Sequence, residues 1–151
     1  DKVHDGPKMT GKAYRVPGYP VSPGQKVPTK DFEIINAMPV KSLITSPKTR
    51  GQLNGRSMTV RGHAWAGDDA VERIDISIDF GVTWIKANLQ APENPYAWQH
   101  WSARVAFPKA GYYEVWSRAT DTKGRSQPFA IAWNPKGYLN NSMHRISVRV
   151  S

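Results

Sequence analysis

Alternation of apolar and polar residues is the feature of this chain that most restricts its fold. Ile74, Ile76, Ile78 and Phe80 lie two residues apart, with polar or charged side chains between them. Successive side chains of a strand point to opposite faces, so this spacing predicts a strand with one buried face. The same spacing predicts half-buried strands at residues 58–65, 98–107, 113–119 and 145–150.

Turn-forming residues separate these segments, among them Asn54-Gly55, Gly81 and residues 121–124. Shorter segments are predicted at residues 84–89 and 128–133, and an edge strand bounded by prolines is predicted within residues 37–47. No segment shows helical periodicity. We therefore predict an all-β fold, namely an immunoglobulin-like antiparallel β-sandwich of about seven strands.

Residues 1–33 differ in composition from the rest of the chain. They contain five prolines and four glycines, which interrupt helices and strands. Tyr14, Val16, Tyr19 and Val21 are spaced through the segment, whereas a flexible linker is usually polar. We predict that residues 1–33 form an extended arm without regular elements, packed on a surface outside this domain. Residues 34–151 are predicted to form the sandwich.

Composition excludes several classes of function. The chain has 151 residues, the length of one domain, and a net charge of +9 without any cysteine, so disulfides and thiolate chemistry are excluded within it. Lysine and arginine are not clustered, which favours a solvated basic surface over nucleic-acid binding. No apolar run is long enough for membrane insertion. The chain starts at Asp1 without a signal peptide, and we expect a mature, truncated or excised piece.

Catalytic and metal-binding patterns are absent from the sequence. None of the four histidines, His4, His63, His100 and His144, has the spacing of a metal-ligand pair. No Gly-x-Ser-x-Gly motif supports a serine nucleophile. Six acidic residues fall in predicted turns or on outward strand positions, where we expect solvated side chains: Asp68, Asp69, Glu72, Asp75, Asp79 and Asp121. We assign no catalytic, cofactor-binding or metal-binding residue to this chain.

Six tryptophans and six tyrosines exceed what the core of one sandwich needs. Trp98 and Trp101 lie close together in the sequence, as do Tyr112, Tyr113 and Trp116. Exposed aromatic rows bind sugar rings in many carbohydrate-binding modules, while aromatic residues are also enriched in protein interfaces. A free-standing carbohydrate-binding module is therefore an alternative to a core or interface role for these rings.

The stretch from Trp133 to Asn141 is predicted to be a loop before the last strand. Pro135-Lys136-Gly137 and Asn140-Asn141 favour turns, because proline fixes φ and glycine and asparagine tolerate positive φ. A loop with these polar side chains could present them outside the domain. His144 follows the loop, and a structural hydrogen bond at the strand end is the alternative to a functional role.

Six segments, taken in order, resemble one family. They are Lys12–Pro17, Met38–Pro47, Val60–Trp65, Asp79–Trp84, Arg118–Asp121 and Trp133–Asn141, the last running into His144-Arg145. Together they cover nearly the whole chain and resemble the C-terminal dimerisation domain of the sulfite oxidase family of molybdenum enzymes.

This resemblance implies an upstream catalytic domain that holds molybdenum and molybdopterin through a Cys ligand. It implies that the chain is a fragment of such an enzyme or one piece of a split protein, that it is not catalytic alone, and that it supplies a homodimer interface. The arm would connect the two domains. A cytochrome is a candidate electron acceptor, and bacterial members of the family suggest a periplasmic location.

The resemblance also singles out Lys136. Family members typically carry an arginine there, which reaches the substrate pocket and helps to bind the anion, whereas nitrate-reducing relatives tend to carry an uncharged residue. Lysine keeps the charge but loses the bidentate fork. His144 and Arg145 are expected to organise the loop from behind. We therefore predict the dimerisation domain of a bacterial-type sulfite oxidoreductase that converts sulfite to sulfate.

Overall fold

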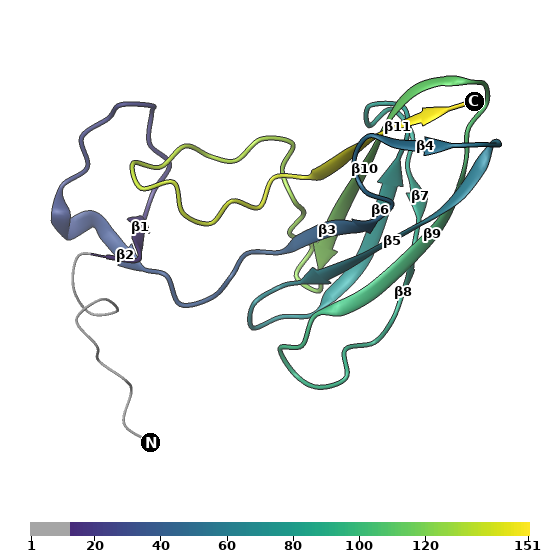
Figure 1. The fold of residues 1–151 in the computed structure, drawn as a ribbon. Helices are drawn as coiled ribbons and strands as arrows, with labels where there is room; N and C mark the ends of the chain where they lie inside the picture. The colour runs from purple at the N-terminus through teal and green to yellow at the C-terminus, as the bar shows by residue number, and fades with distance from the viewer. Residues whose placement is uncertain (1–12) are drawn as a thin grey trace.

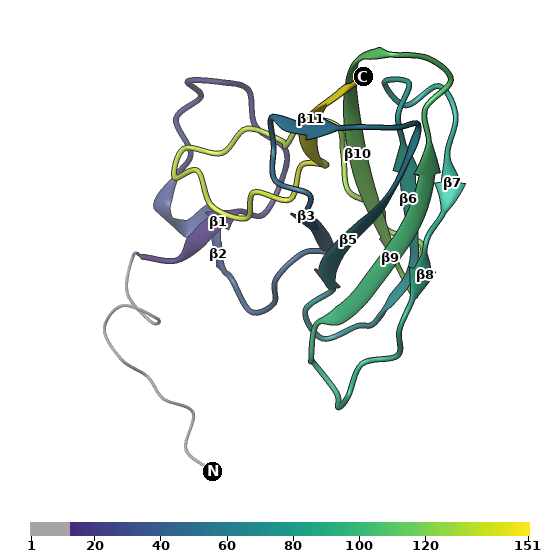
Figure 2. The same ribbon diagram turned by 45° about the vertical axis from the view of Figure 1, so that its right-hand side comes forward.

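The computed structural model describes residues 13–151. His4 and the first twelve residues of the predicted arm lie outside the described residues. Figure 1 and Figure 2 show that most of the described chain forms two β-sheets packed face to face, with the arm and one long loop extending beyond one end.

Each sheet combines strands from distant parts of the chain. The first sheet contains, in spatial order, β3 (Lys41–Ser46), β5 (Ser57–Trp65), β9 (Gln99–Ala106) and β8 (Asn88–Leu89). The second contains, in spatial order, β4 (Gly51–Leu53), β11 (His144–Val150), β10 (Gly111–Asp121), β6 (Val71–Ser77) and β7 (Ile85–Lys86). Neighbouring strands are antiparallel, except that β4 and β11 run parallel.

The strand order confirms the predicted sandwich. Lettered A to G in chain order, β3, β5, β6, β8, β9, β10 and β11 form the ABED and GFC sheets of an immunoglobulin-like domain. β4 and β7 extend the second sheet at its two edges.

The hydrophobic core lies between the sheets. Side chains predicted to face inward are buried on both sheets, among them Ile74, Ile76, Trp101, Val115 and Val148. Each buried aliphatic side chain contributes roughly 1.5–3 kcal/mol. Phe80 differs from the prediction and is 60% exposed, because β6 ends at Ser77 and the chain turns at Phe80 with φ of +60°.

The predicted return strand at residues 84–89 is divided between the two sheets. β7 pairs with β6, whereas β8 pairs with β9 in the other sheet. Ala87 lies between them, is buried, and donates its N–H to Ile74 O at 2.9 Å. The chain therefore crosses from one sheet to the other within this segment.

Two other predicted segments are shorter or different in structure. β3 lies at a sheet edge as predicted, but the strand covers only the second half of residues 37–47. The strand predicted at residues 128–133 is wrong. Pro128 has no N–H for a strand ladder, and its carbonyl accepts a hydrogen bond from Met143 N at 2.9 Å. This bond closes the base of the long loop, residues 128–143, between β10 and β11.

The described part of the arm contains regular secondary structure, although its prolines and glycines led us to predict none. β1 (Arg15–Pro17) pairs antiparallel with β2 (Phe32–Ile34), and a turn of 3-10 helix (Thr29–Asp31) precedes β2. Pro17 is the last residue of an edge strand, a position where a missing N–H is tolerated. The other prolines of the described arm lie between the two strands, so the short ladder forms.

The side chain of Gln127 joins both sheets to the base of the long loop. Its Oε1 accepts hydrogen bonds from the backbone N–H groups of Ser42 on β3 and Ala119 on β10, both at 2.9 Å. Its Nε2 donates to the carbonyl oxygens of Asn141 and Ser142, at 3.1 and 3.0 Å. The side chain is only 1% exposed, so one buried amide satisfies four backbone groups from three segments.

Replacing Gln127 with alanine is expected to lower the free energy of unfolding by about 2–4 kcal/mol. The substitution leaves the buried N–H groups of Ser42 and Ala119 without partners and removes buried volume. Urea unfolding measures the change. Gln52→Ala is the matched control, because Gln52 is exposed on β4 and its loss should cost less than about 0.5 kcal/mol. Equal losses in the two variants would contradict this role for Gln127.

Candidate functional site

The tip of the long loop is a compact turn organised by Asn134. Its side-chain Oδ1 accepts hydrogen bonds from the backbone N–H groups of Lys136 and Tyr138, both at 3.2 Å. Its Nδ2 donates to Tyr138 O at 3.0 Å. Gly137 has a φ of +67°, a conformation that glycine adopts without steric cost. The turn therefore fixes the backbone at Lys136, whose side chain is exposed.

The loop tip packs on the arm. The rings of Tyr138 and Tyr14 stack with centroids 5.7 Å apart. Lys136 Nζ lies 5.0 Å from the ring centroid of Phe32 on β2, a distance at which a cation is attracted to an aromatic face. The arm and the loop are far apart in sequence, yet both views show them side by side (Figure 1, Figure 2).

A groove of about 340 Å³ lies between the arm and the loop. Residues 16–20 form one side, and the other side includes Ile131, Trp133, Tyr138 and Leu139. Trp133 is 36% exposed and lines the groove.

Polar contacts hold the C-terminal end of the loop against β3. Lys41 donates from Nζ to Asn140 O, and Asn141 donates from Nδ2 to Val40 O at 3.4 Å. Ser142 donates from both its backbone N and its hydroxyl to Asn140 Oδ1. Together with Gln127, these contacts give the loop a defined path from β10 to β11.

His144 makes the structural hydrogen bond that the sequence left as an alternative. Its Nδ1 accepts from the backbone N–H of Ile44 at 3.0 Å, which links the start of β11 to β3. Nδ1 must be unprotonated to accept this bond. Burial, with a further effect from the charge of Lys41, lowers the pKa of His144 below 6.5.

Arg145 lies on the outer face of the second sheet. Its Nη1 is 3.8 Å from Glu114 Oε2 on β10. His144 and Arg145 thus have partners on β3 and β10, while Lys136 contacts Phe32 on β2. That His144 and Arg145 organise the loop carrying Lys136 stays a prediction.

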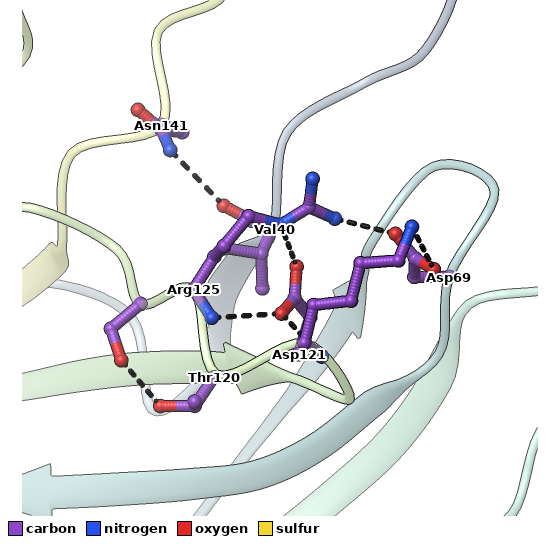
Figure 3. Close-up of polar contacts among 8 residues, drawn as sticks. Val40, Asp69, Thr120, Asp121, Arg125 and Asn141 are labelled. Atoms are coloured by element: carbon purple, nitrogen blue, oxygen red, sulfur yellow. Dashed lines mark hydrogen bonds and ion pairs between the residues drawn. The ribbon is translucent and has the colours of Figure 1, made fainter.

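Asp121 and Asp75 were expected to be solvated, but both are buried, so that expectation is wrong for these two residues. Asp121 is 0% exposed and accepts hydrogen bonds from Lys123 N, Arg125 N and Arg125 Nε (Figure 3). Burial raises the pKa of Asp121, but these hydrogen bonds outweigh it and hold the pKa below its usual value. Asp69 pairs with Lys123 and Arg125 in the same cluster. The cluster closes the turn after β10 and offers no free carboxylate for catalysis.

Asp75 is also buried, although it lies on the outward face of β6. Arg73 Nε and Arg118 Nη2 donate to its Oδ2 at 3.0 and 3.2 Å. Arg118 in turn lies over the ring of Trp84, 4.0 Å from its centroid. Sequence spacing located the outward face but gave no sign that these large side chains would cover it.

Two histidines come together across the first sheet. His63 and His100 are directly paired on β5 and β9, with ring centroids 4.5 Å apart. Within residues 13–151, no group of three or more histidine, cysteine, aspartate or glutamate side chains could hold a metal ion. Over the same residues, no helix is long and apolar enough to cross a membrane.

The aromatic residues do not form one exposed row. Trp98 is 59% exposed, whereas Trp101 is buried in the core and Trp116 is 8% exposed. Trp101 lies on the inward face of β9, whereas Trp98 lies just before the first residue of that strand. Trp98 instead lines a separate hollow of about 410 Å³ with Met38, Trp65 and Tyr96.

Stability is expected to fall as the pH drops below about 6.5, the ordinary pKa of histidine. In the unfolded chain His144 takes up a proton near that pH, whereas in the folded chain its lowered pKa keeps it neutral. The stabilising contribution is therefore present above the unfolded pKa and decreases until the folded pKa is reached. His63 adds a loss of the same sign, because burial and the nearby His100 lower its pKa. Urea unfolding at a series of pH values measures the effect.

His144→Asn separates the contribution of His144 from the rest. An asparagine oxygen can accept a hydrogen bond without titrating. The variant should show a smaller loss of stability between neutral and acidic pH than the unaltered chain, and an identical loss would contradict the assignment.

Comparisons with known proteins show the family of the chain and support its fold. The family described as Mo-co oxidoreductase dimerisation domain matches residues 32–151. The chain is 37% identical to human mitochondrial sulfite oxidase over 142 residues, which cover 86% of the chain and 26% of that protein. It is 31% identical to a rice NADH nitrate reductase over 131 residues, covering 78% of the chain and 14% of that protein.

A solved structure shows the same fold. The sulfane dehydrogenase SoxCD from Paracoccus pantotrophus matches with a TM-score of 0.71 and 24% identity, over 99% of the chain and 38% of that protein's chain. Among the relatives compared by sequence, the chain spans about a quarter of the length of human sulfite oxidase. Its family match covers most of its residues, and it belongs to the Mo-co oxidoreductase dimerisation domain family.

Proposed function

We propose that this chain is the dimerisation domain of a molybdenum-dependent enzyme that oxidises sulfite to sulfate, and that Lys136 helps to bind the anion. The observation that carries the proposal is the loop tip, where Asn134 fixes the backbone of an exposed cation beside the arm. The similarity to sulfite oxidases supports the reaction, although a nitrate reductase is also a relative.

The position of the loop supports a role at a boundary between domains. The loop and the arm extend together from one end of the sandwich (Figure 1). The arm precedes the sandwich in the chain, and the match covers only 26% of human sulfite oxidase. A catalytic domain preceding the arm would meet the groove and Lys136 at this end.

The residues of this chain do not fit a molybdopterin cofactor. The sequence has no cysteine to serve as a thiolate ligand, and no cluster of three metal-binding side chains occurs among residues 13–151. We therefore place the cofactor in the catalytic domain of the intact enzyme.

Lysine suits a small oxyanion such as sulfite. Its ammonium group is a compact charge with three donors on a flexible stem, which can turn from the Phe32 ring toward an anion nearby. Arginine would add a planar fork and greater geometric selectivity. As the family resemblance implies, nitrate-reducing relatives tend to carry an uncharged residue at this position, so the retained cation supports sulfite rather than nitrate chemistry in this enzyme.

The homodimer is part of the same proposal and is supported by the family's description. A cytochrome electron acceptor and a periplasmic location stay predictions, because no observation on this chain bears on them.

Lys136→Ala in the intact enzyme is expected to raise the KM for sulfite about tenfold to a hundredfold. A hydrogen bond to a charged group contributes roughly 1.5–3 kcal/mol, and 1.4 kcal/mol corresponds to a factor of ten. Steady-state kinetics measures KM, and metal analysis should show unchanged molybdenum content.

Two further variants control this experiment. Lys136→Arg keeps the cation and should retain a KM close to that of the unaltered enzyme. Lys109→Ala removes an exposed lysine in the turn between β9 and β10 and should change nothing. An unaltered KM in Lys136→Ala would rule out the binding role.

A further inference from the structure

The pairing of β5 with β9 brings two histidines together on the outer face of the first sheet. His63 lies directly opposite His100 in the register of the two strands. Their rings meet edge to face, with centroids 4.5 Å apart and 86° between the ring planes. Residues directly opposite on neighbouring strands have Cβ atoms about 4.5–5.5 Å apart, so the strand pairing itself maintains this arrangement.

The ring nitrogens of this pair are not used by the fold. Within residues 13–151, no hydrogen bond involves a ring nitrogen of His63 or His100, and the rings contact each other and, for His63, Trp98. His144 differs, because its Nδ1 accepts a hydrogen bond from Ile44 N. Neutral imidazole is the commonest metal ligand among side chains, so two unused imidazoles side by side form a candidate chelate.

The geometry of the pair allows both rings to bind one ion. Two imidazole nitrogens bound to a tetrahedral ion each lie about 2.0–2.1 Å from it, and therefore roughly 3.4 Å from each other. Rings with centroids 4.5 Å apart are close enough for one nitrogen of each to reach that separation. Trp98 lies against the His63 ring at 4.9 Å and limits its movement, whereas His100 is exposed and its ring can turn.

The surroundings of the pair select the class of ion. The four strands of the first sheet contain no aspartate or glutamate, and they carry Lys41, Arg61 and Arg104. Magnesium and calcium take oxygen ligands, mostly carboxylates, which these strands lack. Copper, nickel and zinc bind imidazole well, with water in the remaining positions. The basic side chains oppose every cation, so bonds to the imidazoles must supply the affinity.

The protonation state of His63 suits such a site. Burial, with a further effect from the charge of His100, lowers the pKa of His63 below 6.5. A metal ion binds the deprotonated ring nitrogen, since a proton and the ion compete for the same lone pair. His63 is therefore neutral and able to bind at neutral pH.

We propose that His63 and His100 form a two-histidine site for a divalent transition-metal ion. Copper(II) binds most tightly, because the affinity of a given nitrogen site for divalent first-row metals peaks at copper. The bound ion links β5 to β9. This inference goes beyond the proposed function and depends neither on the sulfite reaction nor on Lys136.

Isothermal titration calorimetry of the full 151-residue chain with copper(II) chloride tests the site. One ion should bind per chain. His63→Phe and His100→Ala should each raise the dissociation constant about a hundredfold, because a second ligand on the same scaffold adds affinity of that order. Phenylalanine keeps a ring against Trp98, and His100 is exposed, so both variants should fold. Thermal unfolding without metal checks their folding.

Tryptophan fluorescence locates the ion while both histidines are kept. Copper(II) quenches indole rings close to it, and Trp98 lies against His63. Trp98→Phe should therefore reduce the quenched fraction of the fluorescence, whereas Trp133→Phe, in the long loop, should not. Quenching that is lost in Trp133→Phe and kept in Trp98→Phe would place the ion elsewhere and contradict the site.

The other two histidines of the chain supply matched controls. His4→Ala and His144→Asn should leave copper binding unchanged, and magnesium chloride should not displace the copper. Copper binding that persists in both His63→Phe and His100→Ala, or that is lost in His4→Ala or His144→Asn, would overturn the proposal. An absence of binding at millimolar copper(II), or displacement of copper by magnesium, would overturn it as well.

Discussion

Two buried side-chain amides bridge the layers of this sandwich. Gln127 binds backbone groups of β3, β10 and the loop base, and Gln99 on β9 binds both backbone groups of Val71 at the start of β6. Strands of opposite sheets cannot share a backbone ladder, so polar groups at their ends need other partners. The glutamines supply them, and the position of the long loop depends on Gln127.

The path of that loop brings distant residues into one site. Once Gln127 and Lys41 hold its C-terminal end, the tip projects from the sandwich and reaches the arm, where Tyr138 meets Tyr14 and Lys136 meets Phe32. The arm pairs with itself through β1 and β2 and so offers a defined surface. A flexible loop carrying the same lysine would lose more conformational entropy on binding an anion.

The strands of the two sheets differ in charge. Acidic residues of the sandwich strands occur only in the second sheet, at Glu72, Asp75, Glu114 and Asp121. Those at Asp75 and Asp121 are buried with arginine partners, because neighbouring large side chains or a turn cover them. These ion pairs hold the local structure together at positions where the sequence pattern predicted solvated side chains.

The sequence alone determined the fold class, most strand positions and the inward faces, because the two-residue alternation is a local property of each strand. It also identified the loop and, through the family resemblance, Lys136. It did not reveal Gln127, the contact of Lys136 with Phe32, or the burial of Asp75 and Asp121, and for His144 it left the structural hydrogen bond as one of two alternatives. Most of these depend on which segments meet in space, as when Gln127 contacts Ser42 and His144 contacts Ile44 from distant parts of the chain. Only the tertiary structure could decide them.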